Sequence, residues 1–486
     1  MIRKLKKLLC VFLATAMIST VAACGGNDPF QDDDVVTGKY NISITCQDEN
    51  GEKALLQEVK KEYEKLHPDV NIVIKTFSQT VPAYMANYAT NQKKLPDVLW
   101  MPDDYFATFA EGGYFMDLRS FYESSSETDY SLYYESMLHA ASYTGEFRPT
   151  TSYSGTYSGE KSDDGKYGIY FAPRDYNKIA IVYNKNMLKK IGVSLNEIPD
   201  TSEGWSVDEF ISFVKKITGK IEEQPAYSNY RAICLTSGWE PVFSTLMNAL
   251  GSDGFSKEDG TLNYDSETNR GIFDKLYNEL YSDEYAISSD ESNFKGGTVA
   301  MWVMSRPAIV GLSSTMVGED GTPYYDFLPF PAKTESGSNE IGAGCSGYAI
   351  TKIHAEDEQT VNGVTKKTKD LAWDLIKYMI TREGQEVTGK MGSIQPVLKS
   401  LEENGAWRTA ISDKLNHGAF SVGEELRLTS FNRYSPNVRI TLRNYVRGFW
   451  TNLETKSQGT PEKRERLITD VINNFNAKQV LIGDNK

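Results

Sequence analysis

The stretch that decides the fold lies at residues 95–117, which read LPDVLWMPDDYFATFAEGGYFMD. A Pro-Asp turn accompanies the apolar run Leu95–Trp100, which predicts a buried strand. Residues 105–111 then have the pattern of a helix, and Gly112 and Gly113 end it. A strand followed directly by a helix is one unit of an α/β fold, in which helices cover both faces of a mostly parallel sheet.

The same alternation continues on both sides of this unit. Upstream we expect a strand at 41–46, an amphipathic helix at 53–66 that His67-Pro68 ends, and a strand at 70–77. Residues 144–166, rich in Ser, Thr, Gly and Tyr, predict a surface excursion. Further strands are expected at 167–171, 178–183, 231–236, 298–304, 325–330 and 347–352, and helices at 206–217, 241–250, 269–280, 370–379 and 461–475. Because 486 residues exceed one ordinary core, two domains are predicted.

The first 38 residues predict export and membrane anchoring. Four basic residues between positions 3 and 7 precede a short apolar run, a secretory signal pattern too short to span a bilayer comfortably. The sequence Val21-Ala22-Ala23-Cys24 resembles a bacterial lipobox, so we expect residues 1–23 to be removed and Cys24 to be lipidated. The alternative is an ordinary signal peptide with a chance cysteine. Residues 24–38 predict a flexible acidic tether, and the expected location is the extracytoplasmic face of the cell membrane.

Composition narrows the class of ligand. The formal net charge is -14, and loss of the four basic signal residues moves it to about -18. An acidic body argues against nucleic acid, whose binding depends on basic patches. Aromatic residues make up 12% of the chain, with 29 tyrosines and 7 tryptophans. Flat rings with a polar edge serve cores and also saccharide binding.

Recognisable catalytic and metal-binding patterns are missing from the sequence. The four histidines have no metal-ligand spacing, and no C-x-x-C, H-E-x-x-H or G-x-S-x-G motif occurs. Residues 384–390 spell G-x-x-x-x-G-K, but Met391 stands where a phosphate-binding loop needs Ser or Thr. Cys46, Cys234 and Cys345 are far apart in contexts that favour buried thiols. We therefore expect no catalytic residues, cofactor or metal, although a glycosidase carboxylate pair, being defined in space, stays open.

Several short segments of the chain, taken together and in their order, resemble those of a known family. They are 95–100 with Asp103, then 105–117, 179–192 (IAIVYNKNMLKKIG), 199–210 with Trp205, 296–302 (GGTVAMW), 344–350 (GCSGYAI) and 372–385. Together, from about Lys39 onward, they resemble the extracellular solute-binding proteins of carbohydrate ABC importers, the class that includes maltose-binding protein.

This resemblance implies an α/β, two-lobed periplasmic-binding-protein-like fold (type II) with a ligand cleft between the lobes. It implies a first lobe from 39–174 and 347–399, and a second from 175–346 and 400–486. It also implies a non-enzymatic, monomeric protein that binds a carbohydrate and delivers it to ABC permease subunits.

Ten residues are predicted to bind the ligand, most of them just after strands. They are Trp100, Asp103, Asp104, Asp175, Asn177, Trp239, Glu240, Trp302, Arg306 and Tyr348. An ionised carboxylate accepts two hydroxyl donors at once, which suits Asp103 and Asp104. The family often has a basic residue where Asp104 stands, and Asp103 has the alternative of capping the following helix.

The remaining predictions each leave a structural alternative open. Asp175 and Asn177 lie near a lobe crossing, where Asn177 aligns with a ligand-contacting acid of the family, or they form a turn. Trp239 and Glu240 resemble a Glu-Pro-aromatic segment of the family, although Val242 replaces the aromatic residue.

Three later positions are open in the same way. Trp302 is either an aromatic platform or part of the core. Arg306 either donates hydrogen bonds to two hydroxyls of a sugar ring or forms a surface salt bridge. Tyr348 either contacts ligand or supports the hinge.

Other functions remain as alternatives. The same fold can bind a polyamine, phosphate ester, peptide or metal, although aromatic richness favours sugars and the absence of His/Cys clusters disfavours metals. A secreted glycan-active enzyme predicts turnover of the bound saccharide. A sensor or adhesive receptor has no sequence feature in its favour.

Overall fold

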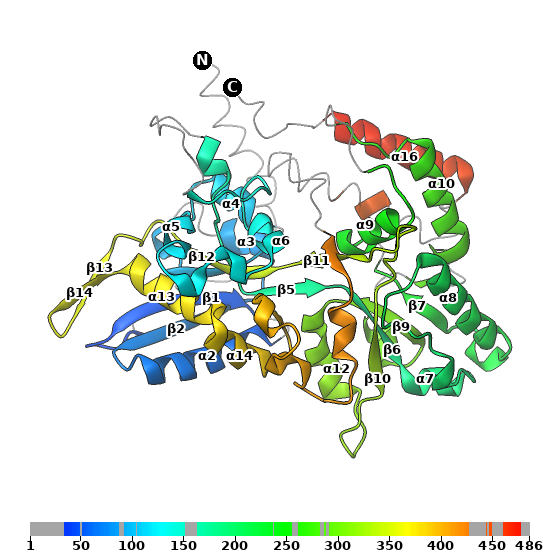
Figure 1. Ribbon diagram of the computed structural model, residues 1–486, viewed down its shortest axis with the longest axis horizontal. Helices are drawn as coiled ribbons and strands as arrows, with labels where there is room; N and C mark the ends of the chain where they lie inside the picture. The colour runs from blue at the N-terminus through cyan, green and yellow to red at the C-terminus, as the bar shows by residue number, and fades with distance from the viewer. Residues whose placement is uncertain are drawn as a thin grey trace, which may run out of the picture.

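The computed structural model describes residues 34–48, 51–86, 92–103, 105–150, 163–236, 238–254, 261–281, 286–287, 291–426, 444, 447–449 and 460–477. Within them, two five-stranded sheets lie side by side and a smaller sheet joins them (Figure 1). We call the part of the protein around the first sheet the first lobe, and the part around the second sheet the second lobe.

The first sheet has the strand order β2-β1-β3-β12-β4. Its strands are β1 (Tyr40–Gln47), β2 (Val70–Phe77), β3 (Val98–Pro102), β4 (Ala172–Pro173) and β12 (Ser346–Ile350). Strand β1 is parallel to β2 and β3, whereas β12 is antiparallel to both of its neighbours. The sheet is therefore mixed, because β12 enters it from the second lobe rather than through a helix of its own lobe.

Helices cover this sheet on both faces, as the sequence predicts. On one side are α2 (Glu52–Leu66), α13 (Thr368–Ile380) and α14 (Arg382–Gly389), and on the other are α4 (Phe106–Glu111), α5 (Arg119–Tyr122) and α6 (Glu135–Ala140) (Figure 1). Helix α2 buries Leu55, Leu56, Val59 and Tyr63, spaced at helical intervals. The short α3 (Val81–Ala86) follows β2.

The second sheet has the order β10-β6-β9-β7-β8. Its strands are β6 (Ala180–Asn184), β7 (Arg231–Cys234), β8 (Ala286–Ile287), β9 (Val299–Met304) and β10 (Tyr325–Pro329). Alternate residues of β6 and β9 enter two different cores: Ile181 and Met301 belong to one, and Val182 and Trp302 to the other. These strands are continuous apolar runs because both faces of the sheet are covered.

The helices of the second lobe divide between those two cores. Helices α7 (Lys185–Lys190), α8 (Val207–Glu222), α9 (Glu240–Ala249), α10 (Glu267–Leu276) and α16 (Pro461–Asn476) contribute to the first, and α11 (Glu291–Lys295) and α12 (Ile309–Thr315) to the second. Helix α8 begins with a capping box, in which Ser206 and Glu209 each bond the other's backbone N–H.

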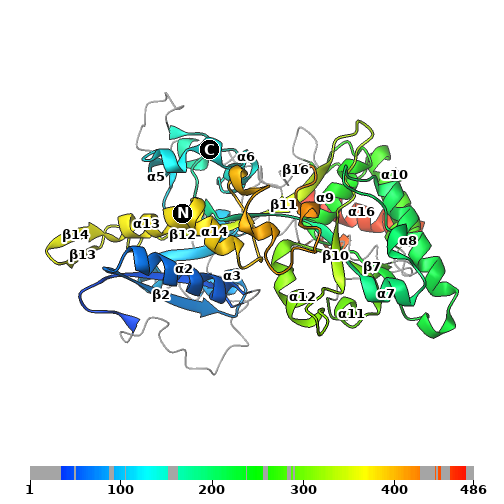
Figure 2. The same cartoon turned by 60° about the horizontal axis from the view of Figure 1, so that its bottom comes forward.

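The joining sheet carries the chain between the lobes. Its order is β15-β5-β11-β16, with β5 (Asp175–Lys178), β11 (Glu340–Gly344), β15 (Gln395–Pro396) and β16 (Glu424–Leu426). Strand β5 continues from β4 into β6, and β11 continues into β12. A third passage follows β15: Leu401 packs in the first-lobe core, whereas Trp407 and Phe420 pack in the second (Figure 2).

Two local expectations need correction or addition. The strand predicted at 167–171 is absent: Ile169 forms only an isolated bridge to Ser142, and the strand is the shorter β4. A hairpin that was not predicted, β13 (Glu358–Val361) and β14 (Val364–Lys367), projects from the first lobe. The three cysteines from position 46 onward are buried free thiols, as predicted. Among the described helices, none is long and apolar enough to cross a bilayer.

Candidate functional site

Arg174 is the centre of a buried polar network at the first passage between the lobes. Its guanidinium donates to both carboxylate oxygens of Glu52, at 2.6 and 2.9 Å, and to Asp175 Oδ2 at 2.8 Å. It also donates to the hydroxyls of Tyr348 and Ser346. Burial opposes the charge, but the neighbouring Glu52, Tyr348 and Asp175 together outweigh burial and raise the pKa of Arg174 well above its ordinary value. The network ties the start of α2 to the passage.

Two predicted ligand residues, Asp175 and Tyr348, belong to this network. Asp175 is 1% exposed, and it also accepts hydrogen bonds from the backbone N–H and hydroxyl of Ser346. Tyr348 is fully buried, and burial raises the pKa of its hydroxyl. The structure favours a supporting role for both residues over direct contact with a ligand.

Asn177 and Asp103 come together beside the same passage. Asn177 Nδ2 donates to Asp175 Oδ1 at 3.0 Å, whereas Asn177 Oδ1 is buried without a hydrogen-bond partner in the described part of the chain. Asn177 stands directly opposite Gly344 in the β5–β11 pair. The Asp103 carboxylate lies over Gly344, since a Cβ added there would be 3.7 Å from Oδ2. Side chains of an opposite pair share a face, so Asp103 and Asn177 flank one spot.

Trp100 lies in β3 of the first lobe, three residues before Asp103. It stands opposite Tyr348 in the β3–β12 pair and is partly buried. Its indole Nε1–H is buried and has no acceptor within the described ranges. The predicted site therefore holds one donor and one acceptor that the described protein groups leave unused. Asp104 lies outside the described residues.

On the second lobe, Trp239 and Glu240 begin α9 next to the passage strand β11. The backbone N–H of Gly342 in β11 donates to Thr245 Oγ1 of α9 at 2.7 Å. A Cβ on Gly342 would lie 2.6 Å from the Pro241 carbonyl oxygen, so only glycine permits this approach. Trp239 is partly buried and Glu240 is buried.

Trp302 and Arg306 lie inside the second lobe. Trp302 is 8% exposed within the core, which favours the core alternative. Arg306 is fully buried: it donates to Trp407 O at 2.7 Å and to His417 Nδ1 at 3.0 Å. The salt bridge expected as its alternative is wrong, because no carboxylate pairs with Arg306 within the described residues.

Aromatic rings, rather than a carboxylate, face the buried Arg306 guanidinium. Its guanidinium carbon lies 4.8 Å from the Trp407 ring centroid and 5.3 Å from that of Phe420. Burial lowers the pKa of Arg306 to about 9. Burial, followed by the nearby Arg306 charge, lowers the pKa of His417 to about 4. His417 is therefore neutral at pH 7 and accepts through Nδ1.

Sequence reasoning missed Glu52, Arg174, Trp407 and His417. One signal was present: the adjacent charges Arg174-Asp175 lie between two buried strands, where charges need partners. The partners of Arg306 gave no signal, since they follow it by more than 100 residues.

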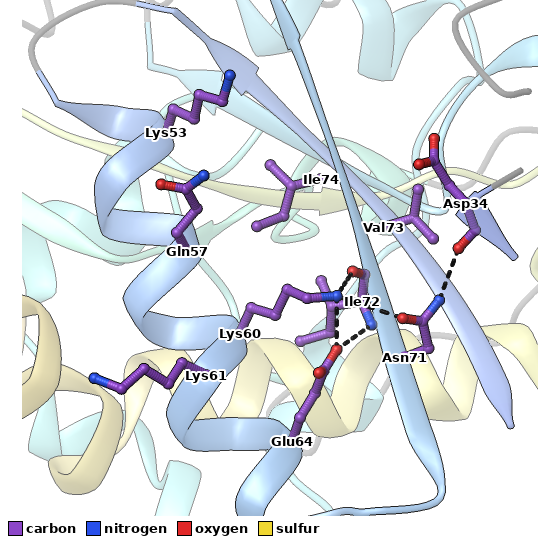
Figure 3. A pocket seen from close by; sticks show the side chains of 10 residues that line it. All are labelled: Asp34, Lys53, Gln57, Lys60, Lys61, Glu64, Asn71, Ile72, Val73 and Ile74. Atoms are coloured by element: carbon purple, nitrogen blue, oxygen red, sulfur yellow. Dashed lines mark hydrogen bonds and ion pairs between the residues drawn. The ribbon is translucent and has the colours of Figure 1, made fainter. Parts of the chain in front are cut away.

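A separate cavity of about 610 Å³ lies between α2 and the edge strand β2, away from the passage (Figure 3). Polar side chains and an apolar stretch of β2 both line it. Lys60 and Glu64 bond the backbone C=O and N–H of Ile72 and so cap the free strand edge. This cavity is not part of the candidate site. Across the described segments, no group of three or more His, Cys, Asp or Glu side chains is arranged to hold a metal.

Comparison with known proteins identifies relatives of the whole fold. A family profile described as bacterial extracellular solute-binding protein matches residues 48–386. The GacH receptor of Streptomyces glaucescens, solved unliganded and with acarbose, has 19% identity and a TM-score of 0.64, over 91% of this chain and 98% of that one. An ABC substrate-binding protein of Listeria monocytogenes in complex with cycloalternan has 16% identity and a TM-score of 0.64, over 90% and 98%.

A third similar structure is maltose-bound MalE3 of T. maritima, with 15% identity and a TM-score of 0.62, over 90% of this chain and 99% of that one. At these identities the likeness establishes the two-lobed fold. No curated protein sequence matches the chain.

Proposed function

From the premise that this chain belongs to the bacterial extracellular solute-binding proteins, a family of transporter binding proteins rather than enzymes, we propose that it captures a carbohydrate between its lobes and delivers it to an ABC importer. The proposed ligand is an oligosaccharide. Three structures similar to this one were solved with acarbose, cycloalternan and maltose, which supports this choice.

The observation that carries the proposal is the pairing of Asp103 and Asn177 over Gly344. A carboxylate and an unused amide oxygen near one residue can accept hydroxyl protons, and Trp100, three residues before Asp103, has an indole N–H without an acceptor among the described residues. Hydrogen bonds to a charged acceptor contribute about 1.5–3 kcal/mol each. A sugar supplies such donors on neighbouring carbons.

The position of this pair supports a closing mechanism. Asp103 is carried by the first lobe, whereas Asn177 and Gly344 lie on strands that pass between the lobes. A ligand that bonds the first lobe and these joining strands at once would bind the closed form more tightly than the open form, and that difference would drive closure. We further propose that the protein acts as a monomer, anchored through a lipid on Cys24 and facing the permease subunits of its importer.

The test is a thermal-shift screen of the mature chain against mono- and oligosaccharides, followed by calorimetry with the best ligand. A ligand at a hundredfold excess over its Kd adds about 2.7 kcal/mol of stability. Asp103→Asn and Asn177→Ala should each weaken binding at least tenfold, whereas Asn196→Ala, on the surface of the second lobe, should not change it. A shift with polyamines or peptides and none with sugars would overturn the carbohydrate assignment, and product formation would overturn the non-enzymatic one.

A further inference from the structure

Four exposed aliphatic side chains lie at one end of the first lobe. The described residues expose eight large hydrophobic side chains, and half of them are here: Val35 (54% exposed), Val36 (41%), Leu66 (57%) and Val364 (55%). We call these four residues the end patch. Single exposed aliphatic residues are ordinary, but a group of them indicates contact with another apolar surface.

Hydrogen bonds at the start of β1 hold the end patch together. Tyr40 Oη donates to the Val364 carbonyl at 2.8 Å, and the Val36 N–H donates to Asn41 Oδ1 at 2.9 Å. The Tyr40 N–H donates to Asp69 O at 2.8 Å, which fixes the turn that follows Leu66. Figures 1 and 2 show the β13–β14 hairpin projecting at this same end of the lobe.

The hairpin presents Val364 on a well-defined support. Asn362 and Gly363 both have positive φ, 50° and 78°, as a tight hairpin turn of this kind requires. The Gln359 side chain exchanges two hydrogen bonds with the Asn41 backbone, at 2.7 and 2.9 Å. Only Val361 of the two strands is buried. The hairpin therefore buries little apolar area in the core, and most of its side chains are partly or fully exposed to solvent.

The chain reaches the first lobe at the end patch. Asn71 Nδ2 donates to the Asp34 carbonyl at 3.0 Å (Figure 3). The Asp34 carboxylate pairs with Lys75. Val35 follows Cys24 by 11 residues, a reach of at most about 40 Å. If Cys24 carries a lipid, as proposed above, this patch is the part of the body held nearest the bilayer.

We propose that the end patch rests on the membrane surface, with its aliphatic side chains at the boundary between headgroups and acyl chains. Two lysines border the end patch, where their charged ends can face lipid headgroups. The Lys366 ammonium lies 4.8 Å from the centroid of the Tyr40 ring, and Lys39 directly precedes Tyr40 in the sequence. A tether of this length holds the patch at an effective concentration on the order of millimolar or higher, so a weak affinity for lipid is enough. This contact orients the first lobe on the membrane, and it rests on the proposed lipid anchor.

The test uses the full lipidated chain reconstituted in vesicles of phosphatidylcholine and phosphatidylglycerol with brominated acyl chains. A fluorophore is attached at Val364→Cys and, as a matched control, at Leu132→Cys, which is 39% exposed in the same lobe. The native thiols at 46, 234 and 345 are buried and Cys24 is blocked by its lipid. We expect severalfold stronger quenching at 364 than at 132, and Val36→Asp should reduce it without changing a sugar-induced thermal shift.

The outcomes separate the two proposals. Equal quenching at both positions on vesicle-bound protein would overturn the membrane contact and leave the anchored binding protein intact. Quenching that requires added permease would assign the patch to a protein partner and overturn the proposal. An unmodified Cys24 by mass spectrometry, with no retention on vesicles, would overturn both the anchor and the contact.

Discussion

Removing Glu52 should destabilise the first lobe far more than its place at a helix start suggests. In Glu52→Ala, Arg174 loses both hydrogen bonds to Glu52 while it stays 1% exposed. Taking one partner from a buried ion pair typically costs about 3–5 kcal/mol, since the remaining charge is left without full compensation. Glu52→Gln keeps one acceptor oxygen, so its loss should be smaller, about 1–3 kcal/mol.

The measurement is urea unfolding followed by far-UV circular dichroism, with calorimetry to resolve the two lobes. Glu58→Ala is the matched control: it lies on the same helix and its partner Lys61 is 57% exposed, so the change should cost under about 1 kcal/mol. Equal losses for Glu52→Ala and Glu58→Ala would refute the idea that the network stabilises the passage.

Two further predictions follow from single contacts. The pKa of His417 is lowered from 6.5 to about 4 in the folded protein, so the unfolded chain binds this proton more readily. The contribution of neutral His417 to the free energy of unfolding is therefore fully present above pH 6.5, and about 3 kcal/mol of it is lost as the pH falls toward 4. His417→Asn should flatten this loss in denaturation measured from pH 7.5 to 4.5, and an unchanged slope would contradict it. Gly347→Ala puts a Cβ 2.0 Å from the Ala172 carbonyl oxygen, between β12 and β4. This substitution should lower the free energy of unfolding by about 1–3 kcal/mol or more. Gly219→Ala, in α8 with no atom within 4 Å, should instead be neutral or stabilising in the same melts.

The sequence predicts the elements well where one physical signal dominates. Helix α2 and strand β2 lie where the sequence puts them: α2 buries side chains at helical spacing, and β2 begins with a run of four buried residues. The pattern could not give the direction of β12 or β6, since an apolar run is the same for parallel and antiparallel neighbours. Residues 167–171 resemble a strand because Ile169, Tyr170 and Phe171 fill the first-lobe core, although the segment pairs only through the isolated bridge from Ile169 to Ser142.

The candidate site shows a sharper limit. Asp175 and Asn177 are both polar and lie two residues apart on one strand, and the sequence alone does not assign them different roles. What separates them is Arg174, whose side chain takes up the Asp175 carboxylate. Asp175 in turn accepts a hydrogen bond from the Asn177 amide nitrogen, while the Asn177 amide oxygen is buried without a partner among the described residues. Only the three-dimensional contact with Glu52, 122 residues earlier, makes this division of roles visible.

This division of roles also bears on how binding would drive closure. Strand β5 is fixed at its first-lobe end by the Arg174 network, and β11 is fixed at its second-lobe end by the bond from Gly342 to Thr245. Between these fixed points the two strands pair through Asn177 and Gly344, the position over which Asp103 lies. A ligand bound there contacts the passage itself rather than one lobe alone. Under the proposed function, its binding energy would act on the segment that joins the two lobes, where it can favour the closed form over the open one.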